Sequence, residues 1–191
     1  MIFKIFWIIR GLVYKSFFGK FILPSYIGKP IYIKNFNQIF IGKQVRIFPN
    51  SRIECIGKDA KIIIHDNVSI GHNLHLTALS TLEISKNCTI SSNVLITDNQ
   101  HTYQEIDKHI MNQKNIIKKT FIGENCFIGT GAVIDAGTIL GKQCIVGANA
   151  VVSGLYPDYC VIVGAPGRIV KRYDTNTKVW KKTKANSDFI S

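Results

Sequence analysis

Histidine is the residue type in this chain best suited to moving protons, because its unperturbed pKa lies closest to neutrality. The chain has five, which are His65, His72, His75, His101 and His109. The first three could in principle bind zinc, but no third ligand follows them at a spacing typical of a zinc site. We therefore expect no metal, and expect these histidines to be hydrogen-bonded or exposed to solvent. His101, in the segment LITDNQHTY, is the best candidate for a general base because of the pattern that surrounds it.

An aliphatic side chain recurs every six residues through most of the chain. One long run and three shorter blocks keep this period, and they comprise Ile41, Ile47, Ile53, Ile64, Ile70, Leu76, Ile84, Ile90, Ile96, Ile122, Ile128, Ile134, Leu140, Val146 and Val152. A period of six fits neither the turn of an α-helix nor the two-residue repeat of an ordinary strand. It predicts an all-β fold, a parallel β-helix whose three-sided coils take about eighteen residues each.

The interruptions of this period predict where the chain leaves the regular scaffold. The interval grows from six to eleven, eight and twenty-six residues over positions 53–64, 76–84 and 96–122. Each interruption follows a third hexad, so all three should emerge along one edge of the prism. The largest is a loop over residues 97–120 with His101 at its root, and a histidine on a loop anchored to a rigid scaffold suits a general base.

Composition and charge limit the partners of the chain. A length of 191 residues fits one domain, and five cysteines without a CxxC spacing fit a reducing compartment. The net charge of +12 is concentrated at the ends, because the first 61 residues contain eleven Lys or Arg against two acidic residues and the last 25 contain seven against two. No nucleic-acid-binding motif accompanies this charge, so we expect no nucleic acid and favour an anionic membrane surface or a phosphorylated ligand.

The first 24 residues, MIFKIFWIIRGLVYKSFFGKFILP, mix apolar and aromatic side chains with four cations. No uncharged stretch approaches the roughly 20 residues that a spanning helix requires, and no small-residue cleavage site is present. The pattern predicts an amphipathic helix over residues 1–24 that contacts a membrane surface through residues 1–22. The alternative is a helix packed against its own subunit or a neighbouring one.

The later hexads carry a family resemblance. The stretch FIGENCFIGTGAVIDAGTILGKQCIVGANAVVSGLYPDYCVIVGAPGRIVKR is its strongest part, and the whole match covers about residues 39 to 173. In this stretch the chain resembles the hexapeptide-repeat acyltransferases, in particular the galactoside and maltose acetyltransferases and the O-acetyltransferases of lipopolysaccharide and capsule synthesis. The resemblance implies a left-handed coil of about five to six turns, with the β-helix domain over residues 25–166 and a basic tail over residues 167–191.

The same resemblance implies roles for single residues. His101 falls where this branch keeps its catalytic histidine, although Asn99 stands where the polysaccharide enzymes often have another histidine. Acetyl-CoA would contact Thr130, Ala148, Ser153, Gly154, Arg168 and Lys171, with Arg172 as a further cation. The acceptor would contact Asn73, Asp98 and Tyr103. Trp180 and the tail from 178 to 184 would either close over the adenine of the coenzyme or form a loose terminus.

The implied activity is direct transfer of an acetyl group from acetyl-CoA to a hydroxyl of a cell-envelope sugar in lipopolysaccharide O-antigen, capsule or a related precursor. The active sites would be shared between the subunits of a homotrimer in the bacterial cytoplasm, with peripheral contact to the inner face of the cytoplasmic membrane. Two alternatives stay open: N-acetylation of an amino sugar nucleotide, whose enzymes usually carry an additional nucleotide-binding domain, and a non-catalytic β-helix scaffold.

Overall fold

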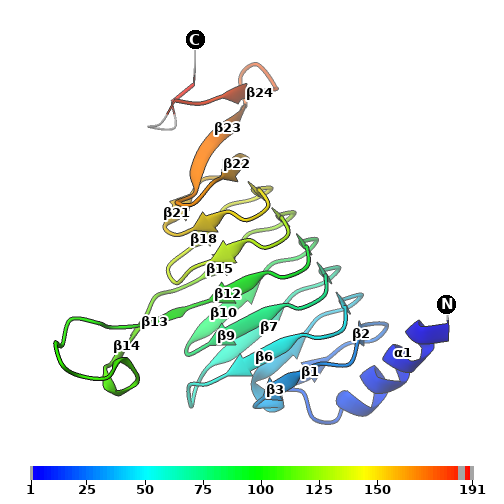
Figure 1. Cartoon of the computed structure of the whole chain (residues 1–191). Helices are drawn as coiled ribbons and strands as arrows, with labels where there is room; N and C mark the ends of the chain where they lie inside the picture. The colour runs from blue at the N-terminus through cyan, green and yellow to red at the C-terminus, as the bar shows by residue number, and fades with distance from the viewer. Residues whose placement is uncertain (1, 185–187, 190–191) are drawn as a thin grey trace.

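A computed structural model describes residues 2–184 and 188–189 of the protein. One α-helix, α1 (Ile2–Tyr14), precedes a solenoid of short parallel strands (Figure 1). The strands form three long sheets that wind as a left-handed β-helix, so the predicted all-β fold is confirmed.

Each sheet takes one strand from successive coils, in the repeating order A, B, C. Sheet A comprises β1 (Lys20–Phe21), β4 (Ile39–Ile41), β7 (Lys61–Ile64), β10 (Thr81–Ile84), β15 (Phe121–Ile122), β18 (Ile139–Leu140) and β21 (Leu155–Tyr156). Sheet B comprises β2 (Tyr26–Ile27), β5 (Arg46–Ile47), β8 (Ser69–Ile70), β11 (Thr89–Ile90), β16 (Phe127–Ile128), β19 (Ile145–Val146) and β22 (Cys160–Val163). Sheet C comprises β3 (Tyr32–Lys34), β6 (Arg52–Cys55), β9 (His75–Ala78), β12 (Leu95–Thr97), β17 (Val133–Ile134) and β20 (Val151–Val152).

The inward side chains form continuous ladders between coils. In sheet A, Ile64, Ile84, Ile122 and Leu140 are successive partners in the parallel register. All fifteen aliphatic residues of the six-residue period are buried, and the five cysteines are buried with them. Because burial of such an aliphatic side chain is worth about 1.5–3 kcal/mol, this ladder is the main source of stability.

The solenoid is longer than predicted. Sheet A contains seven strands, whereas the family resemblance implies about five to six coils. Beyond the fifteen positions of the period, β21 and β22 add a partial last coil. The first coil is also additional, and in it Phe21, Ile27 and Ile33 keep the six-residue spacing. A 3-10 turn, η1 (Phe36–Gln38), then stretches the interval to Ile41 to eight residues and hides this coil in the sequence pattern.

The corners between sheets A and B are alike in successive coils. From the second coil to the sixth, the corner residues have φ between 49° and 61°, and they are Gln44, Asn67, Asn87, Asn125 and Gln143; Tyr159, with a φ of 61°, takes this place in the last coil. Asparagine reaches this left-handed region more readily than most residues because its short polar side chain bonds locally. The last four of these residues each donate their backbone N–H to a carbonyl of the preceding coil. We call this corner the regular edge.

The corners from sheet C to sheet A differ from coil to coil. The chain makes its excursions after β6, β9 and β12, so all three leave one edge of the prism as the interruptions predicted. The longest excursion, over residues 97–120, projects from the side of the solenoid (Figure 1). We call this corner the hairpin edge.

Both ends of the stack are covered by other elements. At the N-terminal end α1 packs against β2, with the Trp7 ring centroid 5.8 Å from that of Tyr26 and 5.5 Å from that of Phe48. At the C-terminal end β22 pairs with an antiparallel extension, β23 (Arg168–Asp174) and β24 (Val179–Lys182). Among the described residues, no helix is both long and apolar enough to cross a membrane.

Candidate active site

The long excursion is an ordered β-hairpin. Strand β13 (Asn99–His101) pairs antiparallel with β14 (Asn115–Ile117), and His101 lies opposite Asn115. At the tip, η2 (Ile110–Asn112) begins after His109, whose Nδ1 accepts a hydrogen bond from the Met111 N–H at 3.2 Å. The predicted loop therefore has secondary structure of its own, and its first strand carries His101.

Gln113 organises the tip of the hairpin from inside. Its side chain is 7% exposed, and its amide nitrogen donates to the carbonyls of Glu105 and Lys108, each at 3.0 Å. Its amide oxygen accepts from the Glu105 N–H at 3.2 Å. A buried amide with several partners fixes the course of the chain around it. Gln113 lies outside the hexads, so the six-residue pattern does not point to it.

Asp98 anchors the hairpin to the preceding coil. Its carboxylate is fully buried, and one oxygen accepts from the Leu79 N–H at 2.8 Å while the other accepts from the N–H and the hydroxyl of Ser80, both at 2.7 Å. Hydrogen bonds to a charged acceptor are stronger than those between neutral groups. The carboxylate predicted to contact the acceptor is thus occupied in holding the root of the hairpin.

Two further bonds fix the hairpin root. The Gln100 amide nitrogen donates to an Asp135 carboxylate oxygen of the following coil at 2.5 Å. The Thr120 hydroxyl donates to the Thr97 carbonyl at 2.8 Å and so joins the two ends of the excursion. The strand that carries His101 is therefore held between the coil before it and the coil after it.

His101 is half-buried, and its Nδ1 atom is buried with no hydrogen-bond partner among the described residues. A buried polar atom without a partner costs about 1–3 kcal/mol. Native proteins leave few such atoms, and those that occur call for a water, a ligand or a neighbouring chain. The His101 Nδ1 atom is one of six buried side-chain atoms of this kind among the described residues, and two of the others lie on β9.

A polar cluster lies on the outer face of sheet C beside this root. Arg52 and Glu54 on β6 form a two-point ion pair, with Nε–Oε2 at 2.5 Å and Nη2–Oε1 at 3.2 Å. On β9, His75 Nε2 lies 3.4 Å from Glu54 Oε2 without hydrogen-bond geometry, and the buried Thr77 hydroxyl has no partner among the described residues. The parallel register sets Thr77 between Glu54 and Thr97, the residue that precedes the hairpin.

The charge state of the cluster follows from its ion pair. The hydrogen bond from Arg52 holds the pKa of Glu54 below its usual value, so the carboxylate is ionised at neutral pH. The six-residue pattern does not predict this cluster. The only sign of the cluster in the sequence is the polar residues at outward positions of two strands, each of which precedes an interruption of the period.

The residues predicted to bind the coenzyme fall into two groups. Thr130 and Ala148 are exposed and lie one coil apart at the corner between sheets B and C, where the Asn149 N–H donates to the Thr130 carbonyl at 2.9 Å. Arg168 and Lys171 are exposed on β23, paired with the last strand of sheet B. These four residues follow one side of the solenoid toward its C-terminal end, which suits an elongated ligand with phosphate groups.

The second group lies on the hairpin edge. Ser153 and Gly154 follow β20, two strands beyond β12 in the order of sheet C. Gly154 has a φ of 97°, and a side chain there would meet nothing within 4 Å. Within one subunit, Ser153 and Gly154 therefore lie on the same edge as His101, whereas Thr130 and Ala148 do not.

The remaining predicted residues also lie apart. Asn73 is a left-handed corner residue between sheets B and C, with a φ of 58° and its amide nitrogen donating to Asn93 Oδ1 at 2.8 Å. Tyr103 is 75% exposed on the hairpin just after His101. Trp180 lies on β24 with its ring 5.7 Å from that of Tyr173, so this part of the tail is an ordered strand.

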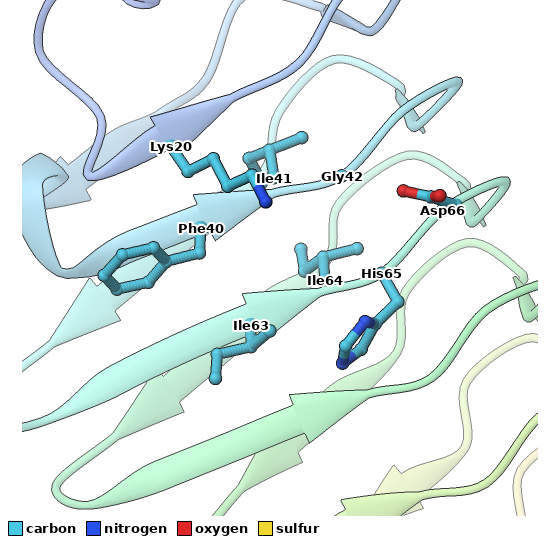
Figure 2. A pocket seen from close by; sticks show the side chains of 8 residues that line it. All are labelled: Lys20, Phe40, Ile41, Gly42, Ile63, Ile64, His65 and Asp66. Atoms are coloured by element: carbon cyan, nitrogen blue, oxygen red, sulfur yellow. The ribbon is translucent and has the colours of Figure 1, made fainter.

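A shallow pocket of about 200 Å³ lies elsewhere, on the outer face of sheet A across the first three coils. Figure 2 shows Lys20 near Ile41 and His65 near Ile64, with Asp66 in the turn that follows β7. Its acidic and imidazole groups are engaged, because His65 lies 2.7 Å from Glu83 and Asp66 accepts from the Lys43 N–H at 2.7 Å. It contains none of the predicted site residues. No group of three or more His, Cys, Asp or Glu side chains in the described part of the chain is placed to hold a metal.

Similarity to known proteins identifies the family of this chain. Residues 119–153 match the hexapeptide repeat of succinyl-transferase. Over 162 residues, the chain is 32% identical to the "Putative lipopolysaccharide biosynthesis O-acetyl transferase WbbJ" of Escherichia coli (strain K12), with 80% of this chain and 81% of that protein covered. The chain belongs to the hexapeptide-repeat acyltransferases.

Solved structures similar to this acyltransferase have the same fold. The N-acyltransferase AntD from Bacillus cereus, in complex with dTDP and 3-hydroxybutyryl-CoA, has a TM-score of 0.75 at 20% identity and covers 88% of this chain and 90% of its own. A galactoside acetyltransferase in complex with coenzyme A has a TM-score of 0.55 at 21% identity, with 95% and 78% covered. At these identities the likeness establishes the fold alone.

Proposed function

We propose that this acyltransferase transfers an acetyl group from acetyl-CoA to a hydroxyl of a cell-envelope sugar, such as a precursor of lipopolysaccharide O-antigen or capsule. The observation that carries the proposal is the hairpin that holds His101, with its unsatisfied Nδ1, beside the polar cluster of sheet C. The name of the relative WbbJ refers to O-acetyl transfer in lipopolysaccharide biosynthesis, which supports a hydroxyl acceptor.

His101 acts as the general base in this proposal. Its unprotonated ring nitrogen takes the proton of the sugar hydroxyl while the hydroxyl oxygen forms an ester bond to the acetyl carbon. The carbon–sulfur bond of the thioester breaks, and the imidazolium returns the proton to the departing thiolate. Atoms and charge balance without an acyl-enzyme, and backbone N–H groups would stabilise the oxyanion.

The polar cluster suits the binding of a sugar. The exposed Arg52 side chain and the ionised Glu54 supply donors and an acceptor, with the His75 imidazole 3.4 Å from Glu54 and the Thr77 hydroxyl on the same strand as His75. A sugar ring carries several adjacent hydroxyls that both donate and accept, so it can satisfy such a set. Tyr103 would contact the same acceptor from the hairpin, and Asp98 would act by holding the hairpin root.

The complete site would lie between subunits. His101, Ser153 and Gly154 are on one side of sheet C, and Thr130 and Ala148 are on the other. A homotrimer in which the hairpin edge of one subunit faces the corner between sheets B and C of the next would unite these groups. Acetyl-CoA would extend along Thr130 and Ala148 toward the charges of Arg168 and Lys171, and Asn73 would reach the acceptor only from the neighbouring subunit. The unpaired cysteines fit a reducing compartment, so we place the reaction in the bacterial cytoplasm.

The first test measures thiol release from acetyl-CoA with a panel of sugars, sugar nucleotides and amino sugar nucleotides. We expect release that depends on a hydroxyl-bearing sugar, with an added acetyl ester detected by mass spectrometry. Release only with amino sugars, with an amide product, would replace O-acetylation by N-acetylation. No release with any acceptor and no binding of CoA would indicate a non-catalytic scaffold.

The second test asks whether the site is shared. Two inactive variants, His101→Ala and Ala148→Trp, are unfolded together and refolded into mixed oligomers. If one subunit supplies His101 and the next supplies the surface at Ala148, some sites in the mixture contain both intact residues, so activity should reappear. Mixed oligomers verified by mass spectrometry that stay inactive would mean that each subunit carries a complete site.

A further inference from the structure

Helix α1 has an apolar surface that the solenoid does not cover. At 100° per residue, Trp7, Gly11, Tyr14 and Phe18 fall on one side of the helix and its continuation, and this side packs on the first coil. The other side carries seven large apolar side chains, each 44–60% exposed, which are Ile5, Phe6, Ile8, Ile9, Leu12, Val13 and Phe17. We call these seven the α1 apolar face. A helix that is apolar on all sides is normally covered on all sides, so this face calls for a second cover.

The charge around the α1 apolar face indicates what covers it. Residues 1–53 contain nine Lys or Arg and no Asp or Glu. Lys15 and Lys20 are exposed just after the helix, and Arg10 lies at its margin, where it donates to the Ile27 carbonyl at 3.4 Å. A second copy docked through the same face would bring two such basic sets together, which is unfavourable. An anionic surface supplies the opposite charge.

We propose that the α1 apolar face lies in the surface of a phospholipid bilayer with anionic head groups. The helix has 13 residues, so it would lie in the plane of the bilayer at a depth of about 5–10 Å, with Lys15 and Lys20 among the head groups. Figure 1 shows α1 on the outside of the N-terminal end of the stack, so the solenoid and the hairpin would stay in water. Docking of this kind does not depend on the proposed function. If both hold, the enzyme is concentrated where a lipid-linked sugar acceptor would be found.

The test compares vesicle binding of the full chain and of the variant Ile9→Gln/Leu12→Gln/Val13→Gln. These three side chains lie at the centre of the α1 apolar face and about half of each is exposed, so the packed side of the helix is left intact. We expect the partition onto vesicles of three parts phosphatidylcholine and one part phosphatidylglycerol to fall by about tenfold or more. The control is Leu155→Gln, which removes a 79% exposed side chain at the other end of the solenoid and should leave partition unchanged.

A second variant keeps the proposal testable if the first one misfolds. Lys15→Glu/Lys20→Glu should weaken binding to the anionic vesicles and leave the weaker binding to pure phosphatidylcholine vesicles nearly unchanged. Thiol release with a soluble acceptor should be normal in both variants, which separates this proposal from the proposed function. Equal partition of wild type and variants would overturn the proposal. A changed oligomeric state of the triple variant in sedimentation, with unchanged vesicle binding, would show instead that a second copy covers the face.

Discussion

The regular edge and the hairpin edge belong to the same coils, yet their corners are stabilised in different ways. At the regular edge a left-handed Asn or Gln turns the chain in successive coils, and the backbone of one corner bonds to the next. At the hairpin edge the corners differ widely in length, and side chains such as Asp98, Thr120 and Gln100 bond to neighbouring coils. Side chains join neighbouring coils at both edges, but at the regular edge the same kind of bond recurs, as in Lys43 N–H to Asp66 and Lys142 N–H to Asp158. At the hairpin edge each such bond occurs once, so a departure from the repeat depends on particular side chains.

The largest expected effect is confined to the hairpin edge. His101→Ala should lower turnover by about 10²- to 10⁴-fold, because general-base assistance is lost. Binding of CoA by calorimetry and the thermal unfolding temperature should change little. His109→Ala, on the tip of the same hairpin, is the matched control and should keep turnover within a few-fold. Full activity of His101→Ala would remove it as the base.

A substitution in the buried aliphatic ladder should destabilise both edges equally. Ile90 is 1% exposed, and Ile90→Ala should lower the free energy of unfolding by about 2–5 kcal/mol, because it loses buried contacts and leaves a cavity. Denaturant titration measures this change, and hydrogen exchange should show both edges losing protection together. The control Val151→Ala removes methyl groups from a side chain that is 38% exposed and should cost much less. Loss of protection at one edge alone would mean that the coils do not unfold as one unit.

A matched pair of variants separates the two edges directly. Asp98→Asn keeps the size of the side chain but replaces its charge, so it should cost about 1–3 kcal/mol of stability and also lower turnover by displacing His101. Asn87→Ala at the regular edge strains a left-handed corner with a φ of 61°, at a cost of about 1–2 kcal/mol, and should leave turnover unchanged. Thermal unfolding and thiol release on the same samples measure both quantities. An equal loss of turnover in the two variants would contradict the distinction between the edges.

The smallest expected effect is the pH dependence of the polar cluster. Arg52 holds the pKa of Glu54 below its ordinary value of 4.5. The stabilising contribution of this carboxylate is therefore complete above that value and is lost as the pH falls through the lower pKa of the folded state. Wild type should be more stable than Glu54→Gln at pH 7, and the difference should shrink as the pH is lowered toward 3. A difference that grows with acidity would show that the ion pair does not stabilise the fold.

The sequence predicts the ladder and the position of its interruptions, because burial in a solenoid depends only on spacing. It does not predict the first coil, because the turn η1 stretches the interval from Ile33 to Ile41. The neighbours of Thr77 in the sheet and the hydrogen-bond partners of Gln113 cannot be predicted from the six-residue pattern either, since they depend on which strands lie side by side and on how the hairpin folds back. His101 is placed at the root of the excursion by spacing, but only the structure shows that its Nδ1 has no partner there among the described residues.

The burial of the cysteines has a practical consequence. All five are at most 1% exposed, and burial raises the pKa of the Cys55 thiol to about 12. Because a reagent cannot reach thiols that are buried in the ladder, a colorimetric thiol reagent should not react with the folded protein and should report only the CoA released by the reaction. Under conditions in which the reagent does label the chain, the rate of colour formation measures the rate at which the solenoid opens.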